Sequence, residues 1–155
     1  MNKDTPGIGQ DVPDFEVATS DGKAFKLSEE LKSGRNVKLM FYRGHWWPFC
    51  IHQLAAVQKN YDTYTKFDTR VFALSTDSAK QSARVVNRLN LSATILCDED
   101  RKVVDLFNLR NPLEHDGIAY PATFIINPDG KIRYRSLDGT AKRIDLTDEL
   151  LFLEQ

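Results

Sequence analysis

Apolar and polar positions along this chain form runs that have the lengths of strands and short helices. On both sides of a turn at residues 20–22, apolar residues occupy every second position, which predicts a hairpin within residues 14–27. Residues 37–43 are nearly all apolar, as a central strand covered on both faces is, and residues 69–76 form a second buried strand. Shorter strands are predicted at 93–97, 123–126 and 132–136.

Helices are predicted between these strands from a different spacing. Pro48 suits the first turn of a helix, where its missing N–H donor is not needed, and apolar residues then recur in steps of four and three. These positions predict a single helix that runs to about residue 66: Cys50, Leu54, Val57, Tyr61 and Tyr64. A capped helical turn at 28–31 and helices at 78–89, 99–107 and 146–153 complete the pattern.

The order of these elements predicts an α/β fold. Alternating strands and helices favour a central mixed sheet with helices on both faces, and the segments at the two ends add an N-terminal β-hairpin and a late antiparallel pair. The chain has 155 residues, which is enough for one domain spanning residues 1–155 and short for two. No internal repeat or linker divides it.

Composition narrows the function classes. Hydrophobic residues make up 41% and charged residues 28% of the chain, and the formal net charge is −1. Without a basic excess, nucleic acid and anionic membranes are not expected as partners. No run approaches the ~18 apolar residues of a membrane span, the first residues do not resemble a signal peptide, and two cysteines are too few for a secreted disulfide scaffold. We therefore expect a cytoplasmic protein.

The junction after the first central strand carries the most chemistry. Ligands in open α/β sheets gather at the carboxyl ends of strands. Residues 43–52 hold one of the two cysteines, two of the three histidines and both tryptophans. Cys50 would lie in the first helical turn, where the helix dipole and Arg43 favour a thiolate. An alternative is that Cys50 only begins the apolar stripe and is an inert buried residue.

Several motifs together resemble the peroxiredoxin-like redoxins of the AhpC/TSA type, in the thioredoxin superfamily. They are G-x-x-x-P-D-F at 9–15, F-Y-R-G-H-W-W-P-F-C-x-x-Q-L at 41–54 and P-A-T-F-I-I-N-P-D-G-K at 121–131, and the match covers nearly the whole chain. The resemblance implies a thioredoxin fold, reduction of a peroxide or disulfide substrate, and a thioredoxin-type, glutaredoxin-type or glutathione reductant. It also implies a homodimer and no cofactor.

One departure from the family pattern concerns the attacking thiol. The family signature reads W-C-P-F/Y-C, in which the first cysteine attacks and the second resolves, but Trp47 stands at the first position here. Replacement by mutation, a selenocysteine codon decoded as Trp, and natural loss of the chemistry all remain open. The resemblance therefore predicts impaired activity, with Trp47, Cys50 and Arg43 as the catalytic positions. A one-cysteine enzyme that uses Cys50 alone is a further alternative.

A second departure concerns the strand at 123–126. Typical peroxiredoxins carry an arginine three residues before the phenylalanine of this strand, whereas Pro121 occupies that place here, as a cis-proline does in thioredoxins. A cis Tyr120–Pro121 bond is plausible. This shifts the expected activity toward thiol–disulfide exchange. The resemblance gives the substrate pocket as Gly44, His45, Trp46, Pro48, Phe49, Tyr120 and Pro121, with Trp46 packed beside the thiol.

Other residues have less specific interpretations. Cys97 ends a predicted strand and is either a second resolving thiol or a small core residue. His45, Cys50 and His52 match no zinc pattern, so no metal is expected. His115 lies on a polar loop and is expected to be solvated. A non-enzymatic alternative is a redoxin-fold binding or self-associating protein, in which Trp46 and Trp47 form an apolar contact surface.

Overall fold

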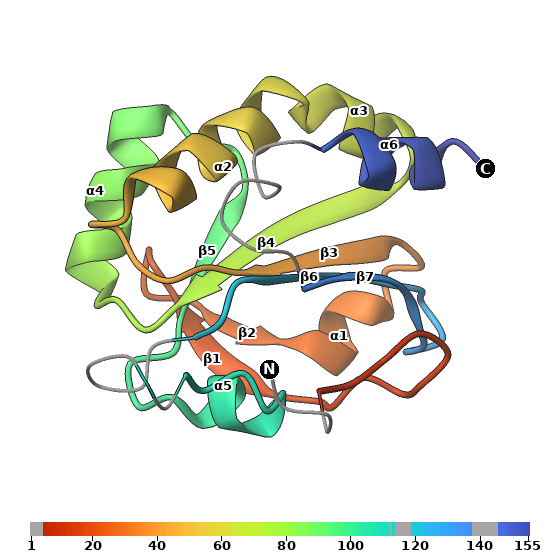
Figure 1. Cartoon of the computed structure of the whole chain (residues 1–155), viewed down its shortest axis with the longest axis horizontal. Coiled ribbons are helices and arrows are strands. Elements are labelled where there is room, and N and C mark those ends of the chain that lie inside the picture. Colours follow the sequence, from red (N-terminus) through yellow and green to blue (C-terminus); the bar gives the residue numbers. More distant parts are fainter. Residues whose placement is uncertain (1–4, 112, 114–118, 138–145) are drawn as a thin grey trace.

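The computed structural model describes residues 5–111, 113, 119–137 and 146–155, apart from the side chains of residues 147 and 148. Within these ranges the strands form one seven-stranded sheet (Figure 1). The strands are β1 (Glu16–Thr19), β2 (Ala24–Lys26), β3 (Asn36–Phe41), β4 (Thr69–Ser75), β5 (Thr94–Cys97), β6 (Ala122–Ile126) and β7 (Ile132–Ser136). The helices are α1 (Leu27–Leu31), α2 (Pro48–Lys59), α3 (Tyr61–Lys66), α4 (Ala79–Leu89), α5 (Lys102–Leu106) and α6 (Thr147–Leu153).

The sheet has the order β2-β1-β5-β4-β3-β6-β7. Strands β3, β4 and β5 are parallel, and both terminal hairpins pair antiparallel with this centre. Helices α2, α3, α4 and α6 cover one face, while α1 and α5 lie on the other (Figure 1). The predicted α/β architecture, with a mixed sheet and an N-terminal hairpin, is confirmed. Among the described residues, no helix is long and apolar enough to cross a membrane.

Successive residues of β3 contribute to two separate cores. Val37, Leu39 and Phe41 belong to the core on the α1 and α5 side, whereas Met40 belongs to the core on the α2 side together with Cys50. This alternation follows from the two-residue period of a strand. It places the residue after the strand, Tyr42, on the α2 side, where it is fully buried.

The structure corrects two helix predictions. The predicted helix from Pro48 to about residue 66 is divided into α2 and α3 at Asn60, whose side-chain Nδ2 donates to the Ala56 carbonyl at 2.8 Å. The apolar stripe hid this break because both helices present it to the same core. Helix α5 begins at Lys102, later than the predicted residue 99, because the buried carboxylate of Asp98 accepts the N–H groups of Val103 and Val104 in the first turn.

A buried ion pair fastens the C-terminal helix to the centre of the sheet. Lys38 of β3 is fully buried, and its Nζ donates to Glu149 Oε2 of α6 at 2.6 Å and to the Tyr64 hydroxyl at 2.8 Å. The Tyr64 hydroxyl donates to the same carboxylate oxygen at 2.7 Å. Each buried polar atom of the trio therefore has a partner, which offsets the cost of desolvating the two charges.

Candidate active site

The candidate site is built on the turn that joins β3 to α2. The Tyr42 N–H donates to the Leu74 carbonyl at 3.0 Å, which extends the ladder between β3 and β4 by one residue. Trp47 has an extended conformation at the helix N-cap, and Pro48 follows at the first helical position. The Cys50 N–H donates to the Trp47 carbonyl at 3.0 Å, so the cysteine lies in the first turn of α2 as predicted.

The thiol of Cys50 is held at the start of a helix and beneath the turn. Its side chain is 0% exposed, and the backbone N–H of Arg43 donates to its Sγ at 3.3 Å. The N-terminus of α2 contributes the positive end of a helix dipole at the same place. A backbone donor and a helix N-terminus both stabilise negative charge on sulfur, which is the form that reacts with peroxides and disulfides.

Aromatic rings form the outer wall of the site. The Arg43 guanidinium carbon lies 4.2 Å from the centroid of the Trp47 ring, and the Trp47 ring contacts Trp46 and Phe49 at centroid distances of 5.6 and 5.9 Å. Trp46 is 50% exposed and Phe49 is 40% exposed. Trp47 is more buried and packs against the core cluster that contains Cys50. The expected packing of Trp46 beside the thiol stays a prediction, and Trp47 is the tryptophan that packs against this cluster.

Gly44 permits the Trp46 ring to lie close to the backbone of the turn. A Cβ atom on Gly44 would lie 2.6 Å from Trp46 Nε1, a distance shorter than van der Waals contact. The turn therefore needs a residue without a side chain where the Trp46 ring passes. The indole N–H of Trp47 is buried and has no hydrogen-bond partner among the described residues.

His45 is fixed by the carboxylate of Asp77, which follows the neighbouring strand β4. Its backbone N–H donates to Asp77 Oδ2 at 2.8 Å, and its Nδ1 lies 2.8 Å from Asp77 Oδ1. Asp77 does not cap α4, because the N-cap of that helix is Ser78, which forms a capping box with Gln81. In the sequence, the only indication of a role for Asp77 in the site was its place directly after a buried strand. The contact with His45 depends on the parallel pairing of β3 with β4, which brings the ends of the two strands together.

Pro121 lies at the same end of the sheet as this turn. It precedes β6, whose Ala122 is paired with Phe41 at the end of β3. The Tyr120 N–H donates to the Leu109 carbonyl at 2.8 Å. No peptide bond between described residues is cis, so the Tyr120–Pro121 bond is trans and the cis alternative is wrong. His115 lies outside the described residues.

Cys97 lies two strands away from the β3–α2 turn. It ends β5 opposite Ser75 of β4, and its thiol donates to the Ser82 hydroxyl of α4 at 3.6 Å. Partial burial raises the pKa of the Cys97 thiol above its ordinary value, with Asp77 and Glu99 adding to the effect. Neither Cys50 nor Cys97 is in a disulfide bond. Across the described part of the chain, no group of three or more His, Cys, Asp or Glu side chains is arranged to hold a metal ion.

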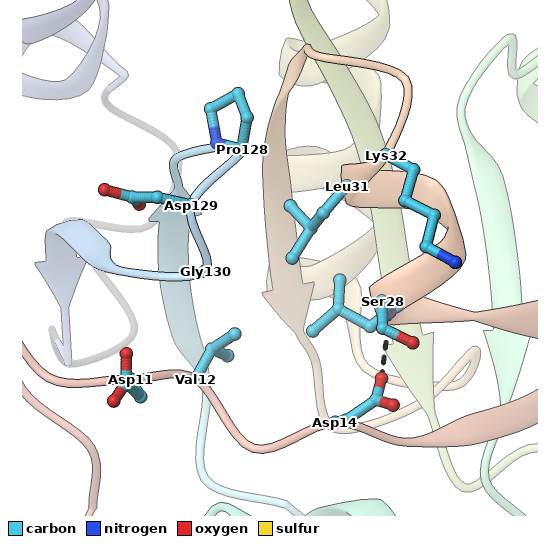
Figure 2. A pocket seen from close by; sticks show the side chains of 10 residues that line it. Asp11, Val12, Asp14, Ser28, Leu31, Lys32, Pro128, Asp129 and Gly130 are labelled. Atoms are coloured by element: carbon cyan, nitrogen blue, oxygen red, sulfur yellow. Dashed lines mark hydrogen bonds between the residues drawn. The ribbon is translucent and has the colours of Figure 1, made fainter.

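A separate cavity of about 390 Å³ lies between α1, the N-terminal segment and the β6–β7 turn (Figure 2). Its carboxylates are engaged by protein groups. Asp14 Oδ1 accepts the Ser28 N–H at 2.9 Å, Asp11 pairs with the Lys131 ammonium at 2.7 Å, and Asp129 accepts the Lys131 N–H at 2.9 Å. Because Val37 pairs with Ile126, this cavity lies at the end of the sheet opposite Cys50.

Comparison with known proteins shows the family of this chain. The model of the AhpC/TSA family matches residues 8–135. The chain belongs to the AhpC/TSA family. It is 30% identical over 128 residues to the putative peroxiredoxin Bcp of Helicobacter pylori, covering 79% of this chain and 82% of that protein. It is 28% identical over 130 residues to the peroxiredoxin Bcp of Escherichia coli, with coverage of 81% and 82%.

Solved structures identify the fold. The peroxidoxin BcpB of Mycobacterium tuberculosis superposes with a TM-score of 0.83 at 21% identity, over 96% of each chain. A mutant of peroxiredoxin 6 of Arenicola marina gives a TM-score of 0.86 at 19% identity, over 96% of this chain and 72% of that one. The predicted thioredoxin-like fold and family resemblance are both confirmed.

Proposed function

We propose that this chain is a peroxiredoxin-type thiol oxidoreductase in which Cys50 is the reacting sulfur and Trp47 limits its turnover. The observation that carries the proposal is the Arg43 N–H, which donates to Cys50 Sγ at 3.3 Å in the first turn of α2. Membership of the AhpC/TSA family and the peroxiredoxin names of its relatives support a peroxide as substrate.

The proposed reaction uses one protein thiol. The Cys50 thiolate attacks one oxygen of a hydroperoxide, the O–O bond breaks, and the other oxygen leaves with a proton as water or an alcohol. Cys50 becomes a sulfenic acid. A thiol reductant of the glutathione, thioredoxin or glutaredoxin class then attacks the sulfur, releasing water and forming a mixed disulfide. A second thiol displaces Cys50 and restores it.

Two features of the site support reduced turnover. Cys50 is 0% exposed and Trp47 packs against the core cluster that contains it, so the peroxide and the reductant reach the thiol only when covering side chains move. In the motif that the chain resembles, the attacking cysteine stands at the position of Trp47, and an indole has no nucleophilic atom for this step. A second thiol at that place would also permit a short disulfide within the first helical turn.

The test compares Trp47→Cys with Trp47→Ser, because both remove the indole but only one adds a thiol. Consumption of hydrogen peroxide and reduction of a model disulfide are measured with dithiothreitol as the reductant. Trp47→Cys is expected to exceed Trp47→Ser in both assays and to form a disulfide with Cys50. Equal rates in the two variants would contradict the idea that position 47 is the site of the missing thiol.

A binding role is a second candidate, favoured by the half-exposed rings of Trp46 and Phe49 on the outer wall. In that case the wall docks a partner or a second copy of the chain. Sedimentation of the native chain and of Trp46→Ser over a range of concentrations tests it. A concentration-independent monomer in both would refute self-association. The homodimer and the cytoplasmic location stay predictions from the family resemblance and the composition.

A further inference from the structure

Asp77 contacts the turn between β3 and α2 through both the backbone and the side chain of His45. Its Oδ2 accepts the His45 backbone N–H at 2.8 Å and the Ser75 hydroxyl at 3.0 Å, and its Oδ1 lies 2.8 Å from His45 Nδ1. The carboxylate side chain is 8% exposed, whereas the imidazole is 35% exposed. One buried carboxylate therefore fixes both the backbone and the ring of His45, and the ring retains a solvent-accessible part.

This contact assigns different roles to the two ring nitrogens. The nitrogen that faces a carboxylate carries a hydrogen, which leaves Nε2 as the nitrogen that exchanges a proton. His45 lies at the middle of a turn whose two flanks both bond to Cys50. On one side the Arg43 N–H donates to Sγ, and on the other the Trp47 carbonyl accepts the Cys50 N–H. In Figure 1 this turn passes beside the start of α4.

We infer that His45, positioned by Asp77, transfers the proton during oxidation of Cys50, an inference that rests on the proposed peroxide chemistry. The Cys50 thiol gives its proton to His45 Nε2 and becomes a thiolate. The thiolate forms a bond to one peroxide oxygen, the O–O bond breaks, and the leaving oxygen takes the proton from Nε2. The products are a sulfenic acid, water or an alcohol, and a neutral imidazole, so atoms and electrons balance.

The charged and titratable groups around this pair come from four elements of the described chain. Tyr42 and Arg43 follow β3, Cys50 belongs to α2, Asp77 follows β4, and Cys97 ends β5. The Asp77 charge acts on Tyr42 and on Cys97 as well as on His45. Within this group, the His45 imidazole is the side chain that contacts the Asp77 carboxylate and has a second nitrogen able to accept and return a proton.

Oxidants with different leaving groups separate proton transfer from a purely structural role. Hydrogen peroxide expels hydroxide, which needs a proton, whereas peracetic acid expels acetate, which does not. The rate of Cys50 oxidation by each is divided by the rate of its alkylation with iodoacetamide at the same pH, which corrects for thiolate content and access. His45→Gln is expected to lower this ratio about 100-fold for hydrogen peroxide and less than about threefold for peracetic acid.

Asp77→Asn is expected to reproduce the same oxidant-dependent loss, and it keeps the inference testable if His45→Gln does not fold. His52→Gln is the matched control, because His52 is exposed on α2 and its change should leave both ratios unaltered. Equal losses with both oxidants, or no loss with either, would overturn the role of His45 and leave the proposed function intact. A native Cys50 that reacts with neither oxidant would overturn both.

Discussion

Truncating Glu149 to alanine is expected to leave a buried positive charge without its counter-ion. Lys38 is 0% exposed, and the substitution removes the carboxylate oxygen that lies 2.6 Å from its ammonium and 2.7 Å from the Tyr64 hydroxyl. Breaking a buried ion pair from one side costs about 3 to 5 kcal/mol. Because domains are stable by about 5 to 15 kcal/mol, this is a large fraction of the total.

The assay is equilibrium unfolding in urea, with the free energy of unfolding extrapolated to water. The exposed pair of Lys32 and Glu29, with a nitrogen–oxygen distance of 3.0 Å, provides a matched control. Glu29→Ala is expected to cost less than about 1 kcal/mol because both side chains are largely solvated. The double variant Lys38→Met, Glu149→Leu is expected to be more stable than Glu149→Ala, since no charge stays buried. Similar costs for Glu149→Ala and Glu29→Ala would refute this reasoning.

Three further outcomes follow from buried groups. Burial raises the pKa of the Tyr42 hydroxyl above its value in the unfolded chain. The contribution of Tyr42 to the free energy of unfolding is therefore complete below pH ~10, the ordinary pKa of tyrosine, and is lost as the pH rises further. The difference in unfolding free energy between the native chain and Tyr42→Phe should fall by about 1.4 kcal/mol per pH unit above pH ~10. A constant difference up to pH ~11 would contradict it. Asp98→Ala should cost about 2 to 3 kcal/mol in urea unfolding, because Asp98 accepts two buried N–H groups at 2.9 and 3.1 Å, whereas the exposed Asp100→Ala should cost less than about 0.5 kcal/mol. Trp47→Ala should speed alkylation of Cys50 by iodoacetamide far more than Trp46→Ala does, and equal effects would show that Trp47 is not the barrier.

Local patterns predicted most of the architecture because they report which faces are buried. The alternation around residues 20–22 and the apolar run before Arg43 both correspond to observed strands, and Pro48 begins α2 as expected. The break at Asn60 escaped the pattern, because a change of helix that keeps the same buried face leaves the spacing of apolar residues unchanged. The late start of α5 depends on a side chain, Asp98, that lies before the helix.

The site was located from the sequence, but its contacts were not. The cluster of unusual residues after β3 pointed to Cys50 and Arg43, and these two are in contact. The pairing of His45 with Asp77 spans 32 positions, and that of Lys38 with Glu149 spans 111. Such partners are set by strand order and helix docking, which short patterns do not encode. Lys38, within an otherwise apolar strand, indicates that an acidic partner is buried beside it, but the sequence does not say which acidic residue that is.

The central claim is that Cys50 is the sulfur that reacts with peroxide. The direct measurement exposes the native chain to hydrogen peroxide in the presence of dimedone, which traps sulfenic acids, and locates the adduct by mass spectrometry. Cys97 serves as an internal reference, because burial raises the pKa of its thiol and disfavours its thiolate. The account predicts an adduct on Cys50 that forms faster than any on Cys97 and is absent in Cys50→Ser. An adduct on Cys97 alone, or on neither cysteine, would contradict it.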